Sequence, residues 1–266
     1  MKKNSSSIKE IIRDAKKGKM FILVDNKDRE NEGDLVVPAS KVNPKKINFM
    51  AKHGRGLICL ALTTYKVKKL NLPLMSLINK SRTQTAFTVS IESKKGISTG
   101  ISAHDRAKTI KVAIKPSSSK KDIVSPGHVF PLVAKNGGVL ERAGHTEASV
   151  DISKLAKLNP SAVICEVMNE DGTMARYNDL IPFAKKHRLK IAKIEDLISY
   201  RLKNEKFIKC ISNKKIKIKK FGNYDLKTFR NKLDGSEHYA ITKGKFTVSK
   251  PSRVRVISTN VLNSFF

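Results

Sequence analysis

The sequence predicts an α/β (α+β) fold of three layers, α/β/α with a mixed sheet, followed by a small β-rich C-terminal remnant. Apolar runs of strand length alternate with helical patterns, without a strict β-α-β rhythm. Capping residues and glycines mark the ends of several helices. After Arg201 the composition changes to lysine with short apolar runs, so we expect domains at residues 1–203 and 204–266.

Helices are expected where a cap precedes apolar residues that recur every three or four positions. Ser7 and Glu10 match a capping box, and Gly18 ends the helix that follows them. Asn43 precedes a proline at a first helical position, and Gly54 ends that helix. Helices are predicted at residues 8–17, 44–53, 103–110, from 146 to beyond 155, 179–187 and 194–202.

Strands are expected where short apolar or alternating runs are bounded by turn residues. The run 162–168 is strongly apolar and contains one charge, Glu166. Residues 117–122 are expected to form a loop, and residues 136–138 a tight turn. Strands are predicted at residues 20–24, 35–39, 56–62, 86–91, 128–134 and 162–168.

Composition limits the function classes. The chain has 266 residues and a net charge of +31, but lysine supplies most of the excess, tryptophan is absent and aromatic residues are 6%. We therefore expect no nucleic-acid partner, although the charge would attract anionic small molecules. No apolar stretch reaches membrane-spanning length. Three widely spaced cysteines predict a reducing, cytoplasmic location rather than a disulfide framework.

An acidic run is the most unusual local feature. Residues 25–34 (DNKDRENEGD) contain five of the chain's 23 carboxylates, directly after a predicted strand. Carboxylates this close repel one another, and a hard cation such as Mg²⁺ would relieve that repulsion. Strand ends are also where α/β sheets bind ligands. The alternative interpretation is a solvated acidic loop.

Four further segments contain chemically useful side chains, each with a structural alternative. His128 follows a Pro-Gly turn and is placed to act as an acid or base, although an isolated histidine is more often structural. Residues 142–147 (RAGHTE) combine an arginine with the start of a helix. This pattern is typical of an anion-binding site, and the alternative is an ordinary helix cap. Glu166 is a carboxylate in an otherwise apolar strand, which is costly unless the residue is functional or forms a buried ion pair with a lysine or arginine. Residues 98–106 (STGISAHDR) suit polar substrate oxygens or a plain cap.

Taken in this order, the segments resemble the 3,4-dihydroxy-2-butanone 4-phosphate synthase family from about residue 8 to 202. The resemblance rests on DRENEGDL at 28–35, HGRGLIC at 53–59, FTVSIE at 87–92, STGISAHDRA at 98–107, SPGHVFPL at 125–132, GGVLERAGHTEASVD at 137–151 and VICEVMNEDGTMAR at 163–176. It implies a lyase of riboflavin biosynthesis that converts ribulose 5-phosphate to L-3,4-dihydroxy-2-butanone 4-phosphate and formate. It also implies two Mg²⁺ ions, with Mn²⁺ as an alternative, and a homodimer with active sites near the subunit interface.

The resemblance also implies residue roles. Glu30 would bind both Mg²⁺ ions, and His145 would bind one of them. Asp25, Asp28 and Glu32 would then supply supporting charge or order the loop. The implied catalytic residues are His128, Glu166 and Asp34. The implied substrate-binding residues are Arg29, Glu30, Asp34, Arg142, Ala143, Gly144, His145, Thr146 and Glu166.

The C-terminal segment resembles only the beginning of a GTP cyclohydrolase II domain, at residues 221–224, 235–241 and 253–258. In that family a Ser-Glu-Cys sequence supplies the first zinc ligand, whereas Ser258 is followed here by Thr259 and Asn260. We therefore expect a vestigial segment without zinc and without cyclohydrolase activity, either a small sheet or poorly ordered. A basic protein that binds RNA or a flavin-pathway partner through this segment is the alternative function.

Overall fold

The computed structural model describes residues 5–76, 78–219, 221–244, 246–247 and 251–257. The contacts divide the chain into two units, Met1–Glu205 and Lys206–Phe266. In the described residues, no helix is long and apolar enough to cross a membrane. Ser258, Thr259 and Asn260, from which the sequence predicts that the first zinc ligand is missing, lie outside the described residues.

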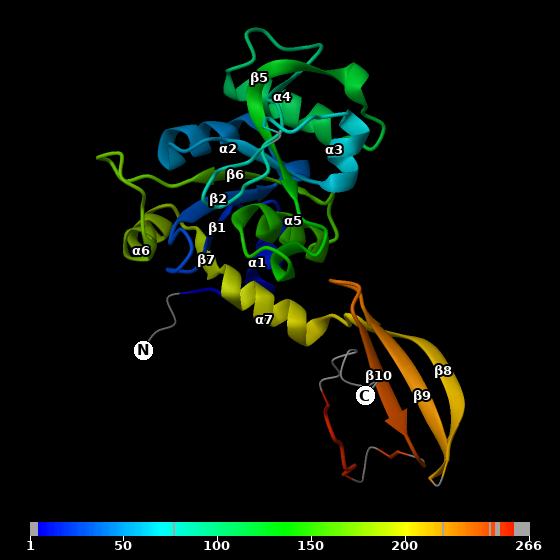
Figure 1. Cartoon of the computed structure of the whole chain (residues 1–266). Coiled ribbons are helices and arrows are strands. Elements are labelled where there is room, and N and C mark those ends of the chain that lie inside the picture. The colour runs from blue at the N-terminus through cyan, green and yellow to red at the C-terminus, as the bar shows by residue number, and fades with distance from the viewer. Residues whose placement is uncertain (1–4, 77, 220, 245, 248–250, 258–266) are drawn as a thin grey trace. The chain divides into compact units, whose positions relative to one another are not determined.

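The first unit contains seven α-helices and seven strands in the described residues, most of them where the alternating pattern predicts an element (Figure 1). Its helices are α1 (Ile8–Lys16), α2 (Pro44–Phe49), α3 (Thr64–Leu70), α4 (Ala103–Ile114), α5 (His145–Leu155), α6 (Tyr177–Lys186) and α7 (Ile194–Asn204). Its strands are β1 (Phe21–Val24), β2 (Gly33–Pro38), β3 (Cys59–Thr63), β4 (Ile91–Ser93), β5 (Ile123–Ala134), β6 (Ser161–Glu166) and β7 (Lys190–Lys193).

The seven strands form one mixed sheet in the order β4-β5-β3-β6-β2-β1-β7. The β3–β5 and β1–β7 pairs are parallel, and the other neighbours are antiparallel. This confirms the predicted mixed sheet. Because β2 and β6 are antiparallel neighbours, the start of β2 lies beside the end of β6, with Asp34 opposite Glu166.

Alternate side chains of the buried strands pack into two separate cores, as the period of a strand requires. On one face, Ile22 and Leu35 pack with residues of α2 and α4 such as Ile47 and Ile110. On the other face, Phe21 and Val36 pack with α1, α5 and α7. Helices therefore cover both faces of the sheet (Figure 1), which confirms the three-layer prediction.

The sequence expectations differ from the structure in several places. The capping box of Ser7 and Glu10 is present, and α5 begins one residue earlier than predicted and ends at Leu155. The helix predicted at 44–53 is α-helical only to Phe49 and continues as a π-helical turn, Met50–Gly54. Two short elements, α3 and β7, were not predicted.

The strand predicted at residues 86–91 is wrong for most of its length. Val133 N–H donates to Ala86 O and Thr88 N–H to Pro131 O, whereas Val89 N–H donates to Pro73 O. The segment therefore divides its backbone hydrogen bonds between β5 and the chain near residue 73, and forms isolated bridges. A strand, β4, begins only at Ile91.

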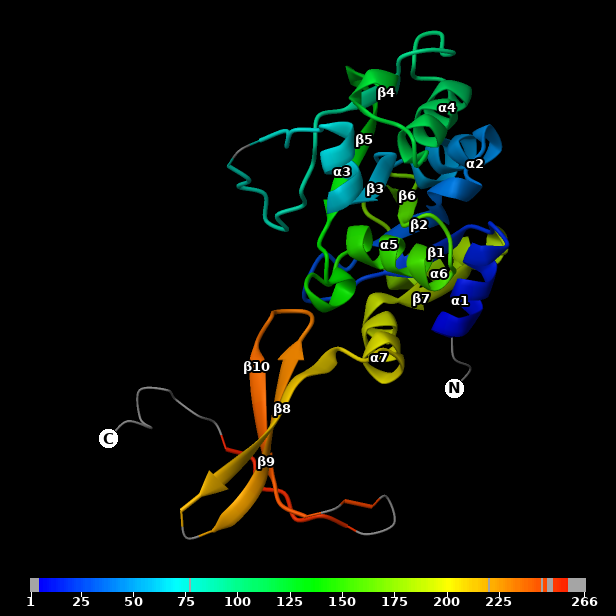
Figure 2. The ribbon, with the colours of Figure 1, turned by 90° about the vertical axis from the view of Figure 1, so that its right-hand side faces the viewer.

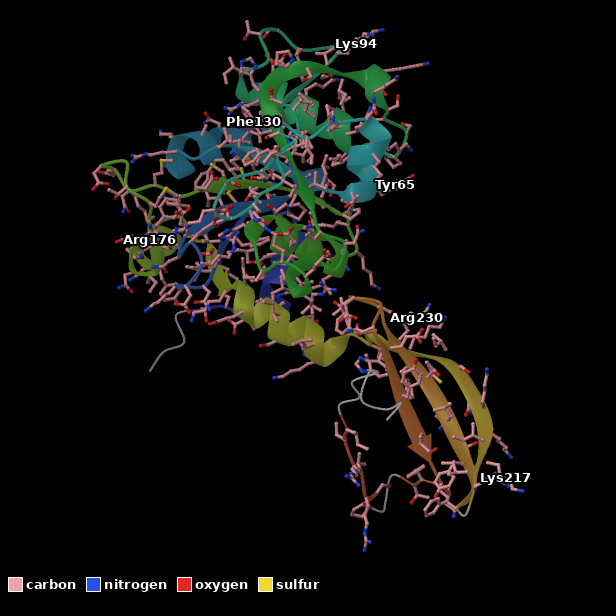
Figure 3. The ribbon with its side chains drawn as sticks, in the orientation of Figure 1. Tyr65, Lys94, Phe130, Arg176, Lys217 and Arg230 are labelled. Carbon is pink, nitrogen blue, oxygen red and sulfur yellow. The ribbon has the colours of Figure 1, made fainter. Side chains whose placement is uncertain are left out.

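The second unit is a three-stranded antiparallel sheet in the order β10-β9-β8, which confirms the expected β-rich remnant. Its strands are β8 (Ile208–Ile218), β9 (Gly222–Asn231) and β10 (Glu237–Thr242). Figure 2 shows the twist of this sheet. Both faces carry charged side chains, among them Lys217 and Arg230, labelled in Figure 3.

Candidate active site

The acidic run forms an ordered loop closed around one buried carboxylate. Asp25 Oδ1 accepts a hydrogen bond from Glu32 N–H (2.8 Å). Its Oδ2 accepts from Glu30 N–H (3.2 Å) and from Arg29 Nη1 (2.7 Å). Arg176, labelled in Figure 3, donates to the carbonyl oxygens of Glu30 and Asn31 from outside the loop. The loop is therefore not a simple solvated segment, because its backbone is fixed at both ends.

Asp34 and Glu166 bring two carboxyl groups together from neighbouring strands. They are register partners on β2 and β6, and Asp34 is only 3% exposed. Burial raises the pKa of Asp34 well above its usual value, and the charge of Glu166 adds to this effect. Burial also raises the pKa of Glu166. Such a pair shares protons readily, because two buried like charges are costly.

Gly56 allows the Glu166 carboxylate to approach the backbone. Glu166 Oε2 accepts a hydrogen bond from Leu57 N–H (2.8 Å). A Cβ atom at Gly56 would lie 2.5 Å from that oxygen and 2.6 Å from the carbonyl oxygen of Glu166. A glycine is therefore required at this position of the HGRGLIC motif.

His145 opens α5 and points its ring into the carboxylate cluster. Its Nδ1 lies 3.9 Å from Glu30 Oε2, and its Nε2 lies 3.8 Å from Asp34 Oδ1. Burial lowers the pKa of His145, against the raising effect of the Asp25 carboxylate. The buried Nε2 has no hydrogen-bond partner, which is costly for a polar atom unless a ligand satisfies it.

Ligand atoms of Asp25, Glu30 and His145 lie within 4.8 Å of one another. Carboxylate oxygens are the ligands that Mg²⁺ prefers, and a neutral imidazole with an unsatisfied nitrogen can complete the set. Both oxygens of Asp25 already accept hydrogen bonds within the loop, so Glu30 and His145 are the better candidates. Glu30 also contacts Arg29, which balances its charge.

Arg142 lines the same pocket and is held in place by three hydrogen bonds. Its Nη1 donates to the buried Glu147 (2.6 Å), and its Nη2 donates to Thr83 O (3.0 Å) and Thr85 Oγ1 (2.9 Å). No side chain caps the first turn of α5, since Gly144 is its N-cap. The guanidinium and the helix start together form a positive wall suited to an anion.

These groups surround one pocket of about 210 Å³ on the α5 side of the sheet. Its lining residues are Arg29, Glu30, Glu32, Asp34, Cys59, Ser81, Thr83, Thr85, Phe87, Leu132, Arg142, His145, Thr146, Ile164 and Glu166. Most of the predicted site residues are in this list. Ala143 and Gly144 flank the pocket without lining it.

Of the three predicted catalytic residues, His128 is the one that does not line the pocket. It lies on β5 with its side chain 44% exposed, and its Nδ1 contacts Glu92 Oε1. Sequence reasoning also missed the hydroxyl groups of Ser81, Thr83 and Thr85. These three residues lie in an irregular segment without periodicity, so no local pattern indicated them.

Comparisons with known proteins identify the family of this chain. The family model of 3,4-dihydroxy-2-butanone 4-phosphate synthase matches residues 9–200, and that of GTP cyclohydrolase II matches residues 209–266. The 3,4-dihydroxy-2-butanone 4-phosphate synthase of Photobacterium phosphoreum is 51% identical over 251 residues, which are 94% of this chain and 69% of that protein.

Two solved structures are similar. RibBX from A. baumannii, a two-domain 3,4-dihydroxy-2-butanone 4-phosphate synthase, superposes with a TM-score of 0.80 at 48% identity, over 90% of this chain and 70% of that chain. A synthase in complex with two magnesium ions has a TM-score of 0.72 at 37% identity, over 75% of this chain and 98% of that one. The chain therefore belongs to the 3,4-dihydroxy-2-butanone 4-phosphate synthase family.

Proposed function

We propose that this chain is a Mg²⁺-dependent lyase that converts ribulose 5-phosphate to L-3,4-dihydroxy-2-butanone 4-phosphate and formate. The observation that carries the proposal is the cluster of Glu30, Asp34, His145 and Glu166 in one pocket, of which Asp34 and His145 are buried. A relative of the same family binds two magnesium ions. We further propose that residues 1–203 form the synthase domain and 204–266 a vestigial GTP cyclohydrolase II-like segment.

In this proposal Glu30 and His145 hold the metal. Bound Mg²⁺ would stabilise the negative charge that develops on substrate oxygens during enolisation. Mn²⁺, which accepts the same ligand types, is expected to substitute. Asp25 orders the loop that carries Glu30, through the three hydrogen bonds that it accepts.

The other residues bind the substrate and move protons. Arg142, with Ala143, Gly144 and the first residues of α5 (His145 and Thr146), would bind the phosphate, and Arg29 the sugar hydroxyls. Asp34 and Glu166 lie on adjacent strands, so protons can pass between them and the bound sugar at two neighbouring positions. Asp34, His145 and Thr146 are buried in the pocket wall, which strengthens their electrostatic interactions.

His128 fits this scheme only if a second subunit brings it to the pocket, because in its own chain it lies outside the lining. We therefore propose a homodimer in which the half-exposed His128 completes the partner's active site. We also propose a cytoplasmic location, supported by three free cysteines. The alternative of a basic nucleic-acid-binding protein finds no support in the comparisons.

The direct test is formate release from ribulose 5-phosphate by the purified full chain. We expect turnover with Mg²⁺, loss of turnover with a chelator, and recovery when Mg²⁺ or Mn²⁺ is returned. A folded chain that releases no formate with Mg²⁺ would contradict the proposal. GTP turnover with added Zn²⁺, which we expect to be absent, is measured on the same preparation.

A further inference from the structure

His128 is presented by a bulge in β5. The register with β4 jumps between Ile91, which pairs with Val129, and Glu92, which pairs with Val124. Residues 125–128 are the extra residues of β5 between these two pairs, and such bulges re-aim side chains. Gly127 N–H donates to Ser90 Oγ (3.0 Å), which fixes the bulge against the segment before β4.

Glu92 is the carboxylate that faces the imidazole on this bulge. Its Oε1 contacts Nδ1 of His128, and its side chain is only 16% exposed, compared with 44% for the histidine. A carboxylate accepts hydrogen bonds, so Nδ1 carries the proton in this contact. The neutral ring is thereby left with Nε2 as its acceptor, on the side away from Glu92.

The loop of residues 98–102 holds Glu92 in this position. Gly100 has a φ of +87°, and a Cβ atom there would lie 1.7 Å from Glu92 Oε1. Asp105 Oδ2 fixes this loop by accepting from Ser98 Oγ (2.8 Å) and Gly100 N–H (3.1 Å). The hydroxyl-rich STGISAHDR segment is therefore a support for Glu92 and makes no contribution to the lining of the pocket.

We propose that Glu92 is a positioning residue for His128, which sets the tautomer and the direction of the imidazole. This inference rests on the proposed function, in which His128 is catalytic. Nε2 takes a proton from the substrate and later returns it, while the Nδ1 proton stays on the ring. The Glu92 carboxylate stabilises the imidazolium between these two steps, and no other bond is made or broken.

The first test does not depend on activity. Histidine ring nitrogens of the full chain, labelled with ¹⁵N, report the tautomer of each of the six histidines by NMR, and His128→Gln assigns the His128 signals. We expect the Nδ1–H form for His128 in the wild type and a shift toward the Nε2–H form in Glu92→Gln. A ring that shows the same tautomer in both proteins would overturn the inference.

The second test is formate release with Mg²⁺. We expect Glu92→Gln to lower kcat by about 10–100-fold. KM should stay within about twofold, because the residue does not bind substrate. Glu92→Asp keeps the charge and should recover part of kcat. In a His128→Gln background, Glu92→Gln should change kcat by less than about twofold, because the two residues act as one unit.

A control variant tests whether the loss of kcat is specific to Glu92. Glu195→Gln removes a carboxylate that pairs with a different basic residue, Lys193 (2.9 Å), and that does not line the pocket, so it should leave kcat unchanged. If His128→Gln is inactive while Glu92→Gln retains wild-type kcat, the inference fails and the proposed function stands. A folded wild type that releases no formate would contradict both the inference on Glu92 and the proposed function. If Glu92→Gln does not fold, Glu92→Asp tests the same contact, because its carboxylate is one methylene shorter: we expect a smaller loss of kcat and a partial shift of His128 toward the Nε2–H form, and an unchanged kcat and tautomer would overturn the inference.

Discussion

The two units of the chain use β-strands in opposite ways. In Met1–Glu205, helices cover both faces of the sheet, and every residue of β1 and β2 is buried. In the described part of Lys206–Phe266, no residue is buried, although its three strands are longer on average. Extended, hydrogen-bonded backbone is thus not enough to create a protected environment.

This difference explains why the candidate chemistry lies in the first unit. Burial raises the pKa values of Asp34 and Glu166 and leaves a polar atom of His145 without a partner. Carboxylates of the second unit, such as Glu237, are exposed and interact with nearby cations in water. Electrostatic interactions are weak there, because water and salt screen them.

The largest expected effect is the loss of turnover when a candidate metal ligand is replaced. Glu30→Gln removes a charged ligand, and we expect formate release to fall by about 10²–10⁴-fold, the range typical of essential catalytic groups. Glu237→Gln, in the exposed sheet of the second unit, is the matched control and should retain full activity. Equal losses in both variants would break the comparison between the two units.

The second expected effect is on stability. Leu60 is fully buried in the first core, so Leu60→Ala should lower the free energy of unfolding by about 2–5 kcal/mol. Ile211 is 40% exposed in the second unit, and Ile211→Ala should change it by less than about 0.5 kcal/mol. Urea unfolding followed by circular dichroism measures both. A large effect of Ile211→Ala would show that the second unit has a core after all.

The smallest expected effect concerns thiol reactivity. Burial raises the pKa values of the Cys59 and Cys165 thiols, whereas Cys210 is exposed on β8. Because the thiolate is the reactive form, we expect one fast-reacting thiol in the native chain and two slow ones. A colorimetric thiol reagent, with and without denaturant, measures this, and Cys210→Ser should remove the fast phase.

Much of the first unit was predictable because local signals agreed with one another. The capping box at Ser7, the proline at position 44 and the apolar run before Glu166 each marked an element that the structure contains. The segment around residues 86–91 was not predictable, because its hydrogen bonds go to two distant partners. Alternating residues alone do not reveal which strand will pair with them.

The sequence indicated which residues form the candidate site, but it did not indicate how they are arranged in space. The resemblance named Glu30, Asp34, His145 and Glu166, which the sheet order brings into one pocket. It also named His128, which lies elsewhere in the chain, and it did not indicate Glu92 as the neighbour of that histidine. Contacts between residues far apart in the sequence depend on strand pairing, which composition and periodicity leave open.

The most direct test of the comparison is formate release by residues 1–205 expressed alone, beside the full chain and at equal folded fraction. Every residue of the proposed chemistry lies in Met1–Glu205, so the shorter protein should retain kcat within about twofold, because no contact to the transition state is lost. A folded, Mg²⁺-supplied fragment that releases no formate, while the full chain does, would contradict the account.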